Sequence, residues 1–216
     1  MGTERPNGPG HDGPIPIATV GLAFEFPQDA TSEESFWEMI CEGRSASTEF
    51  PPDRLNIDAF YHPDENRPSS LLLRGGHFVK EDLGAFDAPF FSISPDEAAY
   101  MDPQHRRLLE THTMLSKTAA SPESSGIPVD KCTGSKTSVY TGSFTNDYLS
   151  ILQQDFDAEQ RHAAMGIAPS MLANRLSWFF NFKGTSMNLD TACSSSMVAL
   201  HLACQDLRTG GCNMVS

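Results

Sequence analysis

Residues 186–207 read SMNLDTACSSSMVALHLACQDL, and this stretch decides the fold that the sequence predicts. Its first five residues are typical of a short strand, and residues 190–196 form a polar turn. Apolar side chains then recur at helical spacing until Gly210-Gly211 stops the helix: Met197, Val198, Leu200, His201, Cys204 and Leu207. A strand that turns directly into an amphipathic helix indicates an α/β layered domain.

The rest of the chain supplies further strands and helices in alternation. Residues 137–142 (TSVYTG) are rich in β-branched and aromatic residues and predict a strand. The apolar run at 15–23 predicts a second, buried strand, and a short strand pairing is expected near 76–79. Helices are expected at residues 32–42, 94–110 and 170–180. Because no internal repeat is evident, these elements indicate one α/β layer architecture.

Two segments depart from this pattern. Residues 1–14 are rich in glycine and proline and predict a disordered leader. Residues 111–125 are polar and contain Pro122, so we expect this atypical segment to interrupt the helix that begins at residue 94. Within that helix, His105 is interpreted as helix surface or as part of an interface, and Arg106-Arg107 as an exposed charge pair.

The composition excludes several classes of protein. The chain has 216 residues, with 15 lysines and arginines against 28 aspartates and glutamates, for a formal net charge of −13. Such a length allows one sizeable core. A strongly acidic chain lacks the basic face that phosphates require, so neither nucleic acid nor a membrane surface is an expected partner. No apolar run approaches the roughly 18–20 residues that span a bilayer, and no secretory signal is evident, so a cytoplasmic protein is expected.

The five cysteines give no sign of a cross-linked or metal-bound protein. Their number is odd, their spacing is irregular and no C-x-x-C pair occurs, which argues against both disulfides and a zinc site. We therefore expect no bound metal and no directly bound cofactor. Most of the five are interpreted as small buried apolar residues. The five are Cys41, Cys132, Cys193, Cys204 and Cys212.

Cys193 differs from the other four because it lies in the turn between the predicted strand and helix. At a helix N-terminus, unpaired N–H groups and the positive end of the helix dipole favour a thiolate. N–H groups of the same turn can stabilise the oxygen that becomes negative when a thioester is attacked. Cys193 is therefore a candidate nucleophile, and a buried structural cysteine is the alternative.

Neighbouring polar residues receive supporting interpretations. Ser194, Ser195 and Ser196 are expected to cap the following helix, and Asp190 to orient the turn through an Asx hydrogen bond. His201 follows Cys193 by eight residues on the same predicted helix, which places it ~12 Å away along the helix axis. It is therefore too distant to hydrogen-bond the Cys193 sulfur.

Four segments resemble, in the same order, the β-ketoacyl synthase domain of fungal type I, highly reducing polyketide synthases. Residues 16–27 resemble the opening strand and loop of that domain. Residues 94–110 (SPDEAAYMDPQHRRLLE) and 139–148 (VYTGSFTNDY) are similar to two internal signatures. Residues 170–204, which include DTACSSS, look like the active-site region. The resemblance covers residues 15–216 and implies the N-terminal half of a thiolase-like α/β fold, incomplete as it stands.

The resemblance also implies an acyltransferase reaction and its partners. In the family, an acyl group moves from the phosphopantetheine of an acyl carrier protein to the cysteine that matches Cys193. A malonyl thioester then loses CO₂, and its enolate attacks the bound acyl group in a Claisen condensation. Family members are homodimers and use two histidines from their C-terminal half, and no matching segment occurs up to Ser216. We therefore expect the isolated chain to be inactive in condensation.

Two other functions are compatible with the same residues. The chain could be a non-catalytic, truncated fragment that serves as a dimerisation or interaction module, or a gene relic. A cysteine hydrolase is a weaker alternative, because no nearby histidine and asparagine pattern accompanies Cys193.

Overall fold

The computed structural model describes residues 13–119, 129–154 and 163–216, which form two compact units. The smaller unit is Leu22–Phe86, and the larger combines Met1–Gly21 with Asp87–Ser216. Residues 1–12 of the predicted leader lie outside the described residues. The larger unit carries Cys193 and is therefore the one that positions the candidate site.

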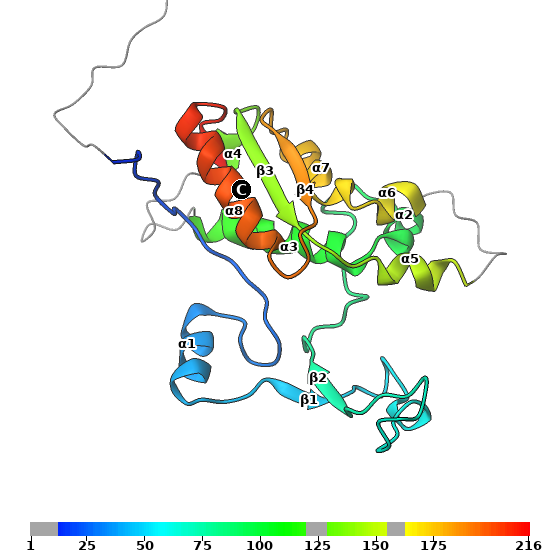
Figure 1. Ribbon diagram of the computed structural model, residues 1–216. Coiled ribbons are helices and arrows are strands. Elements are labelled where there is room, and N and C mark those ends of the chain that lie inside the picture. The colour runs from blue at the N-terminus through cyan, green and yellow to red at the C-terminus, as the bar shows by residue number, and fades with distance from the viewer. Residues whose placement is uncertain (1–12, 120–128, 155–162) are drawn as a thin grey trace, which may run out of the picture. The chain divides into compact units, whose positions relative to one another are not determined.

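A parallel three-stranded sheet forms the centre of the larger unit (Figure 1). β3 (Thr137–Gly142) lies in the middle, with β4 (Ser186–Leu189) on one side and β5 (Met214–Val215) on the other. Three successive β3 residues, Thr137, Ser138 and Val139, are each at most 1% exposed. Consecutive burial of this kind is typical of a parallel strand that is covered on both faces.

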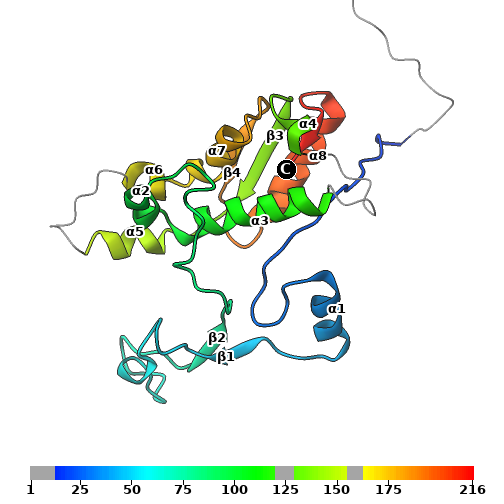
Figure 2. The same ribbon diagram turned by 180° about the vertical axis from the view of Figure 1, so that it is seen from behind.

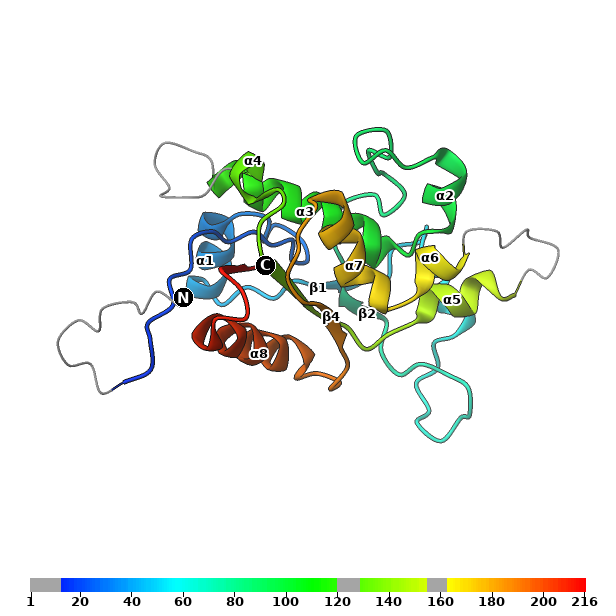
Figure 3. The same cartoon turned by 90° about the horizontal axis from the view of Figure 1, so that it is seen from above.

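Helices cover both faces of this sheet. α8 (Ser195–Thr209) lies on one face, and α7 (Ser170–Phe179) and α3 (Pro103–Ala119) lie on the other (Figure 3). Seen from behind, α3 runs beneath the strands (Figure 2). The shorter helices are α2 (Pro95–Tyr100), α4 (Val129–Cys132), α5 (Asp147–Leu152) and α6 (Ala163–Ile167). The predicted α/β layer architecture is confirmed.

The single helix expected at residues 94–110 is divided into α2 and α3. Ser94 caps α2, because its hydroxyl accepts a hydrogen bond from the Glu97 N–H at 3.1 Å. The chain then leaves the helical conformation, and Asp102 Oδ1 accepts the N–H of Gln104 at 2.8 Å at the start of α3. Proline thus begins a second helix at residue 103 instead of bending the first.

α3 also corrects two expectations about polar residues. It continues to Ala119, so the interruption predicted for 111–125 is wrong over residues 111–119, and residues 120–128 lie outside the described part of the chain. A helix needs only one buried stripe, which Leu109 and His112 provide here. The interpretation of Arg106 as exposed is also wrong, and His105 does not lie on the helix surface, because they are 9% and 3% exposed.

The strand predicted at residues 15–23 is not formed. Residues 15–21 adopt no regular secondary structure, although they lie in the larger unit. Both edges of β3 are already paired, one with β4 and the other with β5. The apolar run therefore cannot pair with the central strand, and among the described residues it does not extend the sheet beyond β4 or β5 either.

The smaller unit contains short elements and clustered aromatic rings. α1 (Glu33–Cys41) begins at a capping box formed by Ser32 and Ser35, which confirms the helix expected at 32–42. β1 (Ser47–Glu49) pairs antiparallel with β2 (Gly75–His77), near the pairing expected at 76–79, and a 3₁₀ turn covers Ile57–Ala59. Across the described residues of both units, no helix is long and apolar enough to cross a bilayer.

Candidate functional site

The turn that carries Cys193 lies between the end of β4 and the start of α8. Gly142 of β3 pairs with Leu189 of β4, so both strands end at the same edge of the sheet. Residues 190–194 follow β4 directly, and α8 begins at Ser195. Cys193 is exposed, which disagrees with the alternative interpretation of a buried structural cysteine.

Ala192 gives the turn its direction. Its φ of 54° lies in the left-handed region, which residues with a Cβ atom seldom adopt. The N–H of Ala192 donates a hydrogen bond to Asp190 Oδ1 at 3.0 Å, so Asp190 orients the turn as predicted. Cys193 is the next residue, and the conformation of Ala192 therefore sets the direction of the Cys193 side chain.

The serine hydroxyls act inside the turn and do not cap α8. Ser194 is the N-cap residue, but its side chain makes no capping hydrogen bond and donates instead to the Thr191 carbonyl at 2.7 Å. Ser195 Oγ donates to the Ala192 carbonyl at 2.7 Å and accepts the Thr191 N–H at 2.9 Å. The prediction that Ser194 and Ser195 cap the helix is therefore wrong, because in this tight turn their hydroxyls donate to the carbonyls of Thr191 and Ala192.

Two N–H groups of the turn are already occupied. The Ser194 N–H donates to the Thr191 carbonyl at 3.3 Å, and the Ser195 N–H donates to the Ala192 carbonyl at 3.0 Å. Neither can donate to a developing oxyanion without breaking the turn. An oxyanion donor supplied by this turn must therefore come from another N–H.

α8 approaches the sheet closely through small residues. Ser195, Ala199 and Ala203 recur every fourth residue and are 3–6% exposed, whereas Met197 and Leu200 are 66% and 56% exposed. The broad face of large apolar residues predicted for this helix is therefore only partly buried. A Cβ atom added at Gly142 would lie 2.7 Å from backbone atoms of residues 195 and 196, so this glycine permits the close approach.

None of the described histidines makes a hydrogen bond to Cys193. His201 is exposed, and its Nε2 lies 3.1 Å from Gln205 Nε2, in agreement with its exclusion from the site. Burial, with a smaller effect from the charge of Arg175, lowers the pKa of His105 to about 4. Burial also lowers the pKa of His112 to about 4. Both are neutral imidazoles of the α3 core at neutral pH.

A buried ion pair holds three of the surrounding helices together. Arg175 of α7 donates from Nη1 to Glu97 Oε1 of α2 at 2.8 Å and from Nη2 to the Met165 carbonyl of α6 at 3.0 Å. The sequence gave no sign of Glu97 as a partner of Arg175. This pair stabilises the scaffold and does not contact Cys193.

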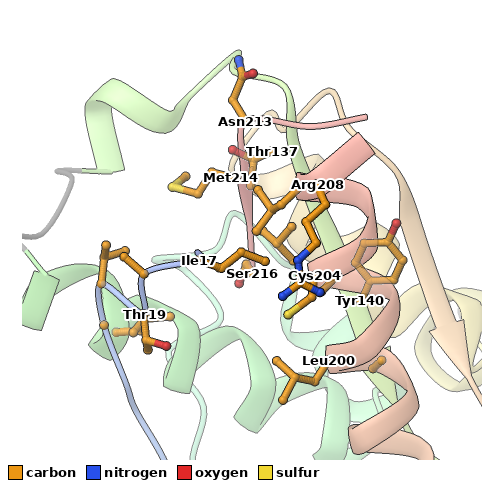
Figure 4. A pocket seen from close by; sticks show the side chains of 18 of the residues that line it. Ile17, Thr19, Thr137, Tyr140, Leu200, Cys204, Arg208, Asn213, Met214 and Ser216 are labelled. Carbon is orange, nitrogen blue, oxygen red and sulfur yellow. The ribbon is translucent and has the colours of Figure 1, made fainter. Parts of the chain in front are cut away.

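An apolar cavity of about 680 Å³ runs along α8. Ile17 and Thr19 lie on one side of it, and Leu200 and Cys204 on the other (Figure 4). Cys193 is not among the lining residues, although Ser196 at the start of α8 is. In the described parts of the chain, no group of three or more His, Cys, Asp or Glu side chains could hold a metal ion.

Comparison with known proteins places this geometry in a family. A family model described as "Beta-ketoacyl synthase, N-terminal domain" matches residues 15–215. The highly reducing polyketide synthase ausV of Aspergillus calidoustus is 44% identical over 206 residues, which cover 95% of this chain and 8% of that protein. The reducing polyketide synthase pksF of Alternaria solani is 48% identical over 202 residues, covering 92% of this chain and 9% of that protein.

Solved structures give the same fold. The oxazolomycin ketosynthase domain from Streptomyces albus JA3453 matches with a TM-score of 0.75 at 33% identity, covering 89% of this chain and 32% of that domain. The ketosynthase from module 6 of the Bacillus subtilis 168 bacillaene synthase matches with a TM-score of 0.72 at 29% identity, covering 91% and 30%. The chain thus spans about a third of these ketosynthases and under a tenth of the two fungal synthases.

Proposed function

Because the chain belongs to the β-ketoacyl synthase family, we propose that it is the cysteine-bearing N-terminal part of a ketosynthase in a polyketide synthase, with Cys193 as its acyl acceptor. The observation that carries this proposal is the exposed Cys193 on a strand–turn–helix whose preceding residue is held at φ 54°. Such a turn presents the sulfur to solvent at the start of a 15-residue helix. A macromolecular thioester can therefore reach it.

The proposed step is a transfer between two thioesters. The Cys193 thiol loses its proton and its sulfur attacks the acyl carbonyl carbon. A new S–C bond forms, the bond between the acyl carbon and the phosphopantetheine sulfur breaks, and the released phosphopantetheine thiolate takes up a proton. Charge develops on the carbonyl oxygen, and a donor to it from the turn must be an N–H other than those of Ser194 and Ser195. The helix dipole of α8 favours the negative charge at this end.

The second step requires groups beyond these. Decarboxylation of the malonyl thioester and attack of its enolate on the Cys193-bound acyl group need donors for a second oxyanion. The resemblance assigns that role to two histidines of the family's C-terminal half, and no segment of the 216 residues matches them. We therefore propose that this chain alone accepts an acyl group but does not complete condensation.

The proposed partners follow from the same chemistry. They are an acyl carrier protein with its phosphopantetheine arm, acyl and malonyl thioesters, and a second ketosynthase subunit in the complete enzyme. A cytoplasmic location, where carrier-protein thioesters are formed, is part of the proposal.

The two steps can be separated in one experiment. The purified chain is incubated with an acyl carrier protein and then with malonyl carrier protein, and both the intact protein mass and the released CO₂ are followed. We expect the wild-type chain and Cys41→Ala to gain one acyl group, Cys193→Ala to gain none, and no 3-ketoacyl product to form. Unchanged acylation of Cys193→Ala would contradict the proposed acceptor. Condensation at rates comparable to a complete synthase would contradict the proposed division of steps.

A further inference from the structure

The Ser195 hydroxyl makes two hydrogen bonds with the backbone around Ala192. It accepts the N–H of Thr191, the residue before Ala192, at 2.9 Å, and it donates to the carbonyl of Ala192 itself at 2.7 Å. Ser195 is 3% exposed, so its hydroxyl is largely shielded from water. Together they connect the N–H of Thr191 and the carbonyl of Ala192 to one hydroxyl, across the left-handed residue.

The conformation of Ala192 needs such support. A left-handed conformation costs a residue with a Cβ atom free energy that glycine does not lose, so it persists only where the surroundings determine it. The Asp190 carboxylate holds the N–H of Ala192, but Asp190 is exposed and its hydrogen bond competes with solvent. The buried hydroxyl of Ser195 is therefore the stronger restraint.

Ser195 is itself fixed against the sheet. Its backbone lies so close to Gly142 that a Cβ atom on this glycine would come within 2.7 Å of the Ser195 carbonyl carbon. Ala199 and Ala203 continue the same close packing along α8. The hydroxyl thus connects the turn to a rigid position at the end of β3.

From these contacts we propose that Ser195 is a positioning residue for Cys193. Its hydroxyl holds Ala192 in the left-handed conformation, and this directs the Cys193 sulfur out of the turn toward an incoming acyl group. The role in acyl transfer rests on the proposed function, whereas the hydrogen bonds of Ser195 are independent of it. Ser195 makes no contact with the acyl group and is not a catalytic residue.

The test measures how selectively Cys193 is alkylated. Limiting iodoacetamide is added to the folded chain, and peptide mapping gives the ratio of labelled Cys193 to labelled Cys41, an exposed thiol in the other unit. We expect Ser195→Ala to lower this ratio about tenfold, the factor that corresponds to ~1.4 kcal/mol.

Ser138→Ala is the matched control. Ser138 is also buried, and its hydroxyl likewise accepts one backbone N–H, that of Thr185 at 3.0 Å, and donates one hydrogen bond, to Asp206 Oδ2 at 2.7 Å. Its loss should lower thermal stability by a similar amount and leave the labelling ratio unchanged. Equal ratios for Ser195→Ala and the wild-type chain, or equal falls in both variants, would overturn the proposal.

A second variant distinguishes positioning from general destabilisation. Glycine adopts a φ of 54° without strain, so Ala192→Gly should reduce the need for the Ser195 hydroxyl. We expect the double variant Ala192→Gly/Ser195→Ala to recover several-fold in selectivity relative to Ser195→Ala alone. Strictly additive effects of the two substitutions would contradict the proposed role.

The same variants separate this inference from the proposed function. If the wild-type chain takes no acyl group from a carrier protein, the proposed function fails, and the labelling ratios still decide the positioning role. If wild-type and Ser195→Ala chains are acylated and labelled equally well, only the positioning role fails.

Discussion

Acidification should destabilise the larger unit because two histidines are buried there as neutral rings. His105 and His112 have their pKa lowered to about 4, whereas a histidine in the unfolded chain titrates near 6.5. Between pH 6.5 and 4 the unfolded chain therefore binds more protons than the folded chain. The free energy of unfolding falls as the pH is lowered through this window, and the loss is complete below pH 4.

The size of the effect follows from these two shifts. From pH 7 to pH 5 each histidine removes about 2 kcal/mol of stability, so the two together remove about 4 kcal/mol. Buried Asp102, whose pKa is raised by desolvation, acts in the opposite sense, and histidine variants isolate the histidine contribution. We expect His112→Gln to reduce the pH-dependent loss by about 2 kcal/mol, and replacement of the exposed His201 by glutamine to leave it unchanged.

Urea unfolding followed by circular dichroism at pH 7, 6 and 5 provides the assay. The wild-type chain should lose stability steadily across this range, and His112→Gln should have a shallower dependence. The reasoning is refuted if stability is independent of pH between 7 and 5, or if His112→Gln and His201→Gln have the same pH dependence.

Two further substitutions test the scaffold around the site. Gly142→Ala should lower the free energy of unfolding by about 2 kcal/mol, because the new Cβ atom would lie 2.7 Å from the backbone at the start of α8. Gly13→Ala is the control, since no atom lies within 4 Å of a Cβ atom there, and equal thermal midpoints for the two variants would contradict the close packing. Glu97→Gln should cost about 3 kcal/mol in urea unfolding, because it leaves buried Arg175 without its carboxylate. Glu49→Gln, in the exposed pair with Arg74, should cost much less, and similar losses in the two variants would show that the Arg175 pair is not a buried one.

Local patterns were sufficient to predict the elements that form the site. The β-branched run at 137–142, the polar turn after β4 and the glycine stop after residue 209 are each determined by neighbouring residues. All three are confirmed, although the turn is shorter than predicted and ends at residue 194. The exposed position of Cys193 follows from the same local order of strand, turn and helix. These are the features that propensity and capping rules describe.

Features that depend on distant residues were not predictable in this way. The apolar run at 15–23 was expected to form a strand, but strand pairing depends on distant residues, and this run joins neither β4 nor β5 at the edges of the sheet. His105 and Arg106 look like surface residues in sequence, yet α3 buries them against other helices of the larger unit. The ion pair of Arg175 and Glu97 joins residues that are 78 positions apart.

The serines of the turn illustrate the same limit at short range. Their residue type is typical of helix caps, but the left-handed Ala192 brings the Thr191 and Ala192 carbonyls within reach of their hydroxyls. No pattern in the sequence marks Ala192 as left-handed, since alanine is an unfavourable choice for that conformation. The hydrogen bonds of Ser195 could therefore be found only in the structure.

The site of acyl attachment tests the central claim most directly. After incubation of the chain with acyl carrier protein, digestion at mildly acidic pH and tandem mass spectrometry locate the thioester among the five cysteines. We predict that the acyl group is on the peptide with Cys193, and that the exposed Cys41 and half-buried Cys204 carry no acyl group. An acyl group on another cysteine, or distributed equally between Cys41 and Cys193, would contradict it.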